Sequence, residues 1–272
     1  MINPQLEKVP DFVLSNSRKD LTDETYSILS NIIIKLKNIK GNNVGNAYNR
    51  IGVIQAFLNQ YEEALYSFEY SLVQEFEVIT YINYLTTLER LGKYKRAFDE
   101  GIQTLCANPN NLAIFEILFD ISTKYMMNEN FNYLKFYEPY LKFNEKKINI
   151  GEKLRKAEDT LNHDNKLLCA NNINIEYYQL LINLAFCEVR KISHGDLVFS
   201  TKINDLGEVS KIIQCDLSIN DLRVLNSSFD NKIDEYIDKG IISFDDYLYH
   251  MDKLFIGYEI KTKQEIVNEV SG

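Results

Sequence analysis

Hydrophobic residues recur at intervals of three and four along the first half of the chain, which is the spacing of one face of an α-helix. The stretch NQYEEALYSFEYSL at 59–72 is followed by GKYKRAFDEGIQTL at 92–105, and each stretch comes after another segment with helical spacing. The positions that match at a distance of 33 residues are Tyr61 and Tyr94, Ala64 and Ala97, and Leu72 and Leu105. The pattern predicts a stack of helical hairpins.

Small residues indicate how the two helices of one hairpin pack. Gly52 and Ala64 are expected to let the helices of the first hairpin approach closely. In the second hairpin Leu85 stands at the position of that glycine, and Gly101 stands at the position of Phe68. We expect these two exchanges to compensate for each other in volume.

These positions resemble the tetratricopeptide repeat, a helical hairpin that stacks into a curved array. The residues that carry the resemblance are Tyr48, Gly52, Ala64 and Phe68 in the first hairpin and Tyr81, Ala97 and Pro109 in the second. The likeness covers residues 44–111 well and 112–143 weakly. It implies that the first helix of each hairpin lines a concave wall that holds a peptide or a protein segment.

The resemblance provides candidate partner-binding residues, here called the predicted wall. They are Asn49, Val53, Ala56 and Phe57 in the first hairpin and Ile82, Asn83, Thr86, Glu89 and Arg90 in the second. Asn83 stands where members of the family use an asparagine to bond a peptide backbone, and an amide can both donate and accept. The family's basic set for a peptide carboxylate is missing, with Val53 and Ile82 in its place. A short amphipathic peptide or helix is therefore the expected ligand.

Further segments extend the array at both ends. LTDETYSILSNIIIKLKNI predicts a leading helix with an inward stripe formed by Tyr26, Leu29, Ile32, Ile33 and Leu36. A degenerate third hairpin follows the second, with a turn at 128–130, a second helix from Phe131, and an inward face formed by Phe115, Leu118, Phe119 and Ile121. The array is thus expected over 21–143, after an N-terminal arm at 1–20.

In the second half the hydrophobic period changes. Helical stripes over 144–192 predict two connecting helices, and the alternation in DLVFSTKI and EVSKIIQCDL predicts a β-hairpin with its turn at 204–207. Helical spacing then returns up to Gly240. A last helix is expected from Ser243 to near Gly257, with an inward face formed by Tyr247, Leu248, Met251 and Leu254.

The predicted fold class follows from these elements. It is mainly α: a tetratricopeptide-like solenoid of helical hairpins, then a small α+β module with a β-hairpin at 193–260, and a tail at 261–272.

Charge makes the second half distinctive. The chain has a net charge of −9, and residues 204–272 contain 14 Asp and Glu against 7 Lys and Arg. Nucleic acid requires a protein surface of the opposite sign, so DNA and RNA are unlikely partners on physical grounds and are not expected. An acidic surface suits a basic protein, and Asp234, Asp238 and Asp245 are the candidate residues for that contact.

Side chains typical of catalysis form no recognisable set. His163, expected in a polar loop, His194 and His250 lack metal-ligand spacing, as do the four cysteines. We therefore expect no catalytic residue, no metal and no cofactor. No apolar run reaches the roughly 18 residues of a membrane span, and the N-terminus lacks the pattern of a signal peptide. The expectation is a cytoplasmic protein without a membrane partner.

Three functions remain open at this stage. The first is an adaptor, scaffold or chaperone-like protein that binds a peptide or protein through its repeats. The second is a dedicated inhibitor, such as an immunity protein or an antitoxin, whose acidic module covers a basic toxin. The third is an enzyme with a metal site formed around Glu235, Asp238, Asp245 and Asp246.

Overall fold

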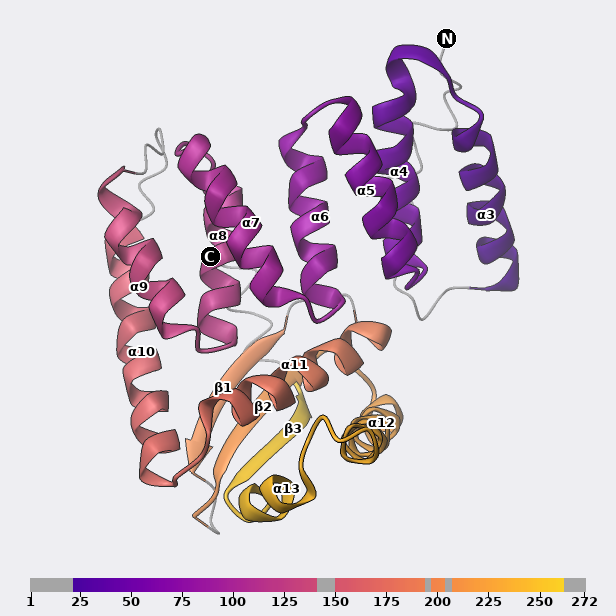
Figure 1. Ribbon diagram of the computed structural model, residues 1–272. Coiled ribbons are helices and arrows are strands. Elements are labelled where there is room, and N and C mark those ends of the chain that lie inside the picture. The colour runs from indigo at the N-terminus through magenta and orange to yellow at the C-terminus, as the bar shows by residue number, and fades with distance from the viewer. Residues whose placement is uncertain (1–21, 141–149, 194–196, 204–206, 262–272) are drawn as a thin grey trace. The chain divides into compact units, whose positions relative to one another are not determined.

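The computed structural model describes residues 22–140, 150–193, 197–203 and 207–261 (Figure 1). The chain forms two compact units, one that contains the described residues up to Ile121 and one that begins at Ser122. Paired helices are followed by a small three-stranded sheet, which confirms the predicted fold class. The boundary between the units lies between Ile121 and Ser122. The predicted arm, and the predicted tail after Lys261, lie outside the described residues.

The first unit consists of helices that stand side by side in chain order (Figure 1). They are α3 (Asp23–Lys37), α4 (Val44–Phe57), α5 (Tyr61–Gln74), α6 (Val78–Arg90), α7 (Tyr94–Ala107) and most of α8 (Leu112–Lys124), with the 3-10 turn η2 (Gly41–Asn43) before α4. Successive helices from α3 to α7 contact each other, and α4 also contacts α6. The first helices of the two matching hairpins are therefore neighbours.

Large and small side chains pair within each hairpin as predicted. A Cβ atom added to Gly52 would lie 2.6 Å from the ring of Phe68, so only glycine leaves room for this ring. A Cβ added to Gly101 would lie 3.2 Å from Leu85 and 2.5 Å from Leu118 of α8. Leu85 therefore lies beside Gly101 as expected, but the side chain that comes closest to this glycine is Leu118 of the next helix.

One type of turn closes every hairpin. Its central residue has a left-handed conformation, at Asn59 (φ 63°), Gly92 (φ 75°), Met126 (φ 50°) and Asn172 (φ 54°). The next residue's N–H donates to a carbonyl five residues back, in the pairs Gln60–Gln55, Lys93–Leu88, Met127–Ser122 and Ile173–Leu168. This is the Schellman motif that ends helices. The predicted turn of the third hairpin at 128–130 is therefore wrong, because the turn precedes Asn128, where α9 already begins.

The leading helix α3 begins at a side-chain cap, because Oγ1 of Thr22 accepts from the N–H of Thr25 at 3.2 Å. Its inward stripe contains Leu29, Ile33 and Leu36, which are buried. Tyr26 was expected on that stripe but is 45% exposed. It lies on the helix's first turn, where its hydroxyl instead accepts a hydrogen bond from Gln60 at 3.2 Å.

The second unit combines helices with the sheet. Its elements are α9 (Asn128–Tyr137), the 3-10 turn η3 (Glu138–Tyr140), α10 (Ile150–Ala170), α11 (Ile175–Ile192), β1 (Val198–Ile203), β2 (Val209–Cys215), α12 (Ile219–Asp238), α13 (Phe244–His250) and β3 (Leu254–Ile260). The connecting helices were predicted correctly. His163 lies within α10, however, and not in a loop.

The strands are ordered β1-β2-β3. The predicted hairpin is present: β1 pairs antiparallel with β2, with Ile203 opposite Val209. Of its predicted turn, only Gly207 is described, at φ 83°. The last helix was predicted too long, because β3 pairs parallel with β2 from Leu254 onward. A parallel strand requires a long crossover, and α12 and α13 provide it.

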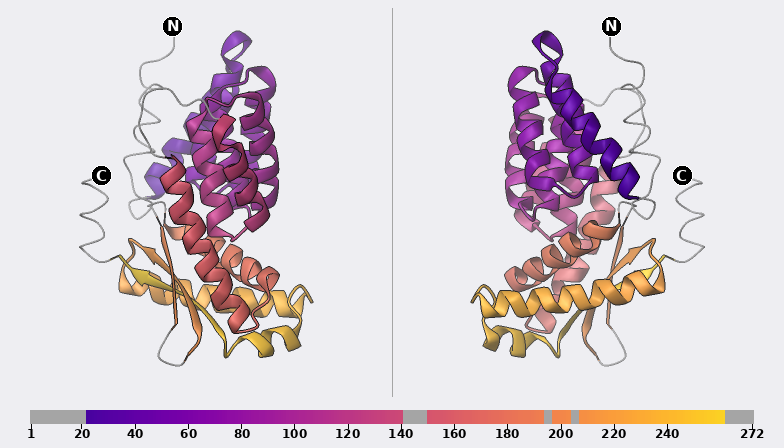
Figure 2. Two further views of the ribbon diagram at one scale, coloured as in Figure 1. Left: turned by 90° about the vertical axis from the view of Figure 1, so that its left-hand side faces the viewer. Right: turned by 90° about the vertical axis from the view of Figure 1, so that its right-hand side faces the viewer.

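Helices cover one face of this sheet. Both α11 and α12 contact β3 and each other, and α12 is the long horizontal helix in the right-hand panel of Figure 2. The buried Tyr258 of β3 donates its hydroxyl to the carbonyl of Ala185 at 2.9 Å, and its ring meets the edge of Phe229 at 6.0 Å. These contacts join the last strand to both helices.

Candidate functional site

The α4 part of the predicted wall lies against the leading helix. Phe57 is 7% exposed and belongs to a core cluster with Leu29 and Leu36 of α3. Val53 is half-buried and packs against the same cluster. Phe57, a candidate partner-binding residue of the predicted wall, is therefore a core side chain, because the leading helix packs against α4.

Asn49 occupies a different environment on α4. Its side chain is half-buried, and Oδ1 is inaccessible to solvent with no hydrogen-bond partner among the described residues. A buried polar atom left without a hydrogen bond costs about 1–3 kcal/mol. This residue thus lowers the stability of the hairpin, which is a feature more typical of functional positions than of packing positions.

The α6 part of the predicted wall is the accessible part. Ile82, Asn83 and Thr86 are half-buried on one side of the helix. No described residue forms a hydrogen bond with the side-chain amide of Asn83, whose backbone carbonyl accepts from Oγ1 of Thr87 at 2.7 Å. An amide that is partly shielded from solvent and bonded to no other described residue can bond to a bound polypeptide.

The end of the wall has a packing role. Glu89 is buried. The guanidinium of Arg90 lies 5.7 Å from the centre of the Tyr61 ring, in cation–π geometry. Arg90 therefore joins α6 to the start of α5, and its place on the wall has a structural reason.

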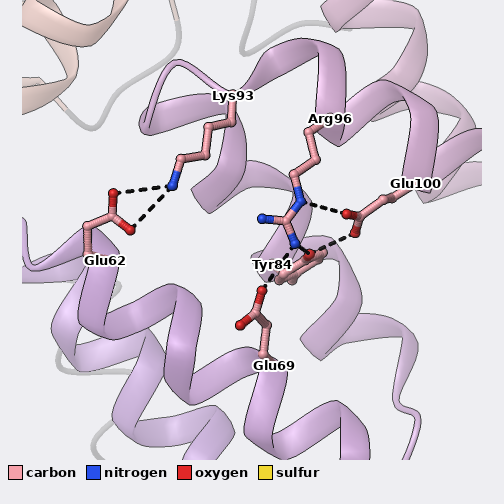
Figure 3. A network of polar contacts seen from close by, with 6 residues as sticks. All are labelled: Glu62, Glu69, Tyr84, Lys93, Arg96 and Glu100. Carbon is pink, nitrogen blue, oxygen red and sulfur yellow. Dashed lines mark hydrogen bonds and ion pairs between the residues drawn. The ribbon is translucent and has the colours of Figure 1, made fainter.

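A polar network holds α6 in place from its opposite side (Figure 3). The buried Tyr84 donates its hydroxyl to Glu100 at 2.7 Å and accepts from Arg96 at 2.8 Å. Arg96 also bonds to Glu100 at 2.6 Å and to Glu69 of α5 at 3.2 Å. Burial, followed by the hydrogen bond to Glu100, raises the pKa of Tyr84 above its ordinary value. The network connects three helices and fixes the orientation of α6.

A second contact joins the same helices. The ammonium of Lys93, just before α7, lies 3.3 Å from the carboxylate of Glu62 in α5 (Figure 3). Both side chains are solvated, so this ion pair contributes at most about 1 kcal/mol. Its geometry repeats the α5–α7 contact that Arg96 makes with Glu69, which indicates a role in stacking.

The predicted acidic residues are spread over the second unit. Asp234 and Asp238 are exposed on α12, and Asp245 is exposed in the first turn of α13. Near them, Glu235 bonds to Lys232 at 2.6 Å and to Lys239, and these bonds lower its pKa to about 2.

The structure does not assemble the metal site considered above. In residues 22–140, 150–193, 197–203 and 207–261, no three His, Cys, Asp or Glu side chains lie close enough to hold a metal ion. Glu235 is instead engaged by its two lysines, and Asp246 lies in the capped first turn of α13. The four acids proposed for that site therefore share no metal centre.

A buried ion pair was missed in the sequence. Nζ of Lys211 on β2 lies 3.2 Å from the carboxylate of Asp164 on α10, and the side chains are 7% and 5% exposed. Thr201 of β1 donates to Asp164 at 2.7 Å and accepts from Lys211 at 2.7 Å. Burial, partly offset by Asp164, lowers the pKa of Lys211. The sequence did contain a signal for this pair, because Lys211 lies between Val209 and Ile213 on the face of the predicted strand that was expected to be buried.

Two hollows in the described residues are lined by residues other than those of the predicted wall. One of about 510 Å³ lies beside α4 and α5, and its lining includes Lys37, Tyr48, Gln55 and Tyr66. Another of about 220 Å³ lies between α11 and α13, and its lining includes Glu176, Tyr177, Ile241, Asp246 and His250.

Comparison with protein-family models, with curated proteins and with solved structures finds no match for this chain. Within the described residues, no helix combines the length and the apolar character needed to cross a membrane. The function is therefore argued from the surfaces themselves.

Proposed function

We propose that this protein is an interaction protein of the tetratricopeptide-like kind, which binds an extended peptide segment of a partner against α6. The observation that carries the proposal is the half-buried side-chain amide of Asn83, to which no other described residue forms a hydrogen bond. Ile82 and Thr86 lie beside it and offer an apolar and a hydroxyl contact. Such a surface suits a short amphipathic peptide.

The rigidity of α6 supports this proposal. Tyr84, on the same helix, is bonded to Glu100 and Arg96 of α7. Because the helix is already ordered, binding a peptide requires little further loss of conformational freedom, and pre-organised surfaces bind more tightly for this reason.

The test begins with a random peptide library displayed on phage and selected on the purified full-length chain. Enriched peptides are synthesised, and their affinities are measured by fluorescence anisotropy. Asn83→Ala is expected to weaken binding about tenfold, the equivalent of about 1.4 kcal/mol for one lost hydrogen bond to the ligand.

The matched control is Gln103→Ala, which removes an exposed amide from α7. It should leave the affinity unchanged, and thermal unfolding should show that both variants fold. If no peptide is enriched, or if Asn83→Ala binds the enriched peptides as tightly as the unmodified chain does, the proposal is wrong.

A further inference from the structure

Among the described residues, helix α13 contacts the second unit through the face that contains His250. His250 is 4% exposed and stacks on Tyr177 of α11 with ring centres 4.3 Å apart. Its Nε2 accepts from the backbone N–H of Asn174 at 3.2 Å, and its Nδ1 bonds to the carbonyl of Asp246 at 2.8 Å. The imidazole therefore links α13 to the first turn of α11.

The other face of α13 is apolar and exposed. Phe244, Leu248 and Met251 are 58%, 47% and 47% exposed. They are four and three residues apart, which places them on one stripe of the helix. We name these three residues the α13 stripe. Ile241, in the preceding turn, adds a fourth side chain at 54% exposure.

Acidic residues border the α13 stripe. Asp245 follows Phe244 and Asp252 follows Met251, and both are exposed. Neither forms an ion pair with another described residue, and the same is true of Asp238 at the end of α12. Unpaired negative charge beside an apolar surface complements a ligand that is apolar on one face and positively charged around it.

The hollow between α11 and α13 strengthens this complementarity. Ile241 lines it together with the carboxylates of Glu176 and Asp246, and its volume is about 220 Å³. An opening with an apolar side and two acids accommodates the stem and the head of a lysine or arginine side chain. Positive charge on the ligand is thus matched by Asp245 and Asp252 beside the α13 stripe, and by Glu176 and Asp246 in the hollow.

The α13 stripe is also formed in advance. A helix of seven residues is not stable by itself. Here Oγ of Ser243 accepts from the N–H of Asp246 at 3.0 Å and caps the helix, while His250 fixes its other end. A partner therefore meets an ordered surface, and little of the binding free energy is spent on folding α13.

We infer that the α13 stripe is the docking site for a basic amphipathic helix of a partner protein. Such a helix places apolar side chains, spaced by three and four residues, on Phe244, Leu248 and Met251. Its lysines or arginines then face Asp245 and Asp252, and one that lies beside Ile241 can reach the hollow. This inference does not depend on the peptide surface of α6.

The test uses a fluorescent peptide of leucine and lysine in amphipathic order, about 14 residues or four helical turns long. Anisotropy with the full-length chain should show binding that weakens as salt is added. Phe244→Ala with Leu248→Ala should reduce the affinity at least tenfold, as expected for central apolar anchors. Asp245→Asn with Asp252→Asn should reduce it and flatten the salt dependence.

Two controls separate this site from general attraction between charges. Val224→Ala removes an exposed apolar side chain from α12 of the same unit and should have no effect. A peptide of identical composition in scrambled order should bind at least tenfold more weakly. Thermal unfolding confirms that each variant is folded.

Several outcomes would overturn the inference. The first is that the peptide does not bind the unmodified chain, and the second is that its binding survives the loss of the Phe244 and Leu248 side chains. Equal binding of the scrambled peptide would mean that charge alone attracts it. Dimerisation of the chain that is abolished by Phe244→Ala would assign the stripe to a second copy instead.

Discussion

Within each matching hairpin, one large side chain lies over one glycine of the facing helix. In the first hairpin the large residue, Phe68, is on the second helix and the glycine is on the first. In the second hairpin Leu85 is on the first helix and Gly101 is on the second, and Leu118 of α8 comes closer to this glycine than Leu85 does. Each glycine leaves room for large side chains of neighbouring helices, although the large and small positions are exchanged between the hairpins.

This arrangement predicts that Gly52→Ala destabilises the protein although alanine favours helix. The added Cβ would lie 2.6 Å from the ring of Phe68, which is 1% exposed and has no free space to move into. Overpacking costs about 1–3 kcal/mol, against a gain of about 1 kcal/mol in helix propensity. A net loss of about 1 kcal/mol is expected in urea unfolding followed by circular dichroism.

Asn46→Ala is the matched control, because Asn46 is exposed on the same helix. It should gain a few tenths of a kcal/mol from propensity alone. Phe68→Leu should lower the free energy of unfolding less in the Gly52→Ala variant than it does in the unmodified chain. Equal costs in both backgrounds would show that the ring and the new methyl group do not meet.

The sheet of the second unit is joined to α10 by the ion pair between Lys211 and Asp164. Removing one member of a buried pair leaves the other charge without compensation, which costs about 3–5 kcal/mol. Replacing both members with apolar side chains is often neutral. We therefore expect Lys211→Met to be strongly destabilising, and Lys211→Met with Asp164→Leu to recover most of the loss.

Denaturant unfolding of the unmodified chain and these variants measures the effect. Thr201, the third member of the cluster, is half-buried, so water can reach its hydroxyl in the double variant. An exposed pair, Arg155 with Asp159 on α10, serves as the control, and its removal should change stability by less than about 1 kcal/mol. A mild effect of Lys211→Met would mean that water reaches the buried site.

The elements that the sequence predicted well are those with a long regular period. The hairpins from α4 to α7 follow from repeated tyrosine, alanine and leucine positions. Strand β3 was missed because Leu254 also fits the helical spacing of Leu248 and Met251, and a run of seven residues is too short to distinguish the two periods. Its alternation of buried Leu254, Ile256 and Tyr258 was the available signal.

The candidate surfaces were predicted less well, for physical reasons. A helical period identifies which face of α4 and α6 is polar, but it does not reveal what packs there. Phe57 became a core residue because α3 lies against it. Leu248 and Met251 of the α13 stripe were predicted to face the interior but are exposed, since an exposed apolar face and a buried one have the same period.

Tyrosine is a main component of the interior of both units. The chain has 18 tyrosines and no tryptophan. Burial raises the pKa of Tyr84, Tyr178 and Tyr258, and it raises that of Tyr177 to about 12. In the unfolded chain these hydroxyls ionise near 10.0. The folded state therefore retains protons that the unfolded state has already lost.

The contribution of these protonated tyrosines to the free energy of unfolding should accordingly be fully present below pH 10 and should decrease as the pH rises above it. Because the pKa of Lys211 is lowered, its contribution makes the protein more stable as the pH rises. That single contribution is opposed by those of the four tyrosines. Circular dichroism and tyrosinate absorbance should show buried tyrosines that ionise only as the helices unfold. Titration of all tyrosines as one class, with the helices intact, would contradict this expectation.

The repeated left-handed turn also has a consequence for how the chain can change in length. Each turn is closed by a hydrogen bond between residues only five positions apart, at Gln60 and Gln55 and again at Lys93 and Leu88. Each of these hydrogen bonds involves only residues of the same hairpin. A gene segment that encodes one whole hairpin can therefore be duplicated in frame, and the longer product keeps every closure it had before. Duplication of whole hairpins therefore extends the binding surface without changing the packing of the existing hairpins.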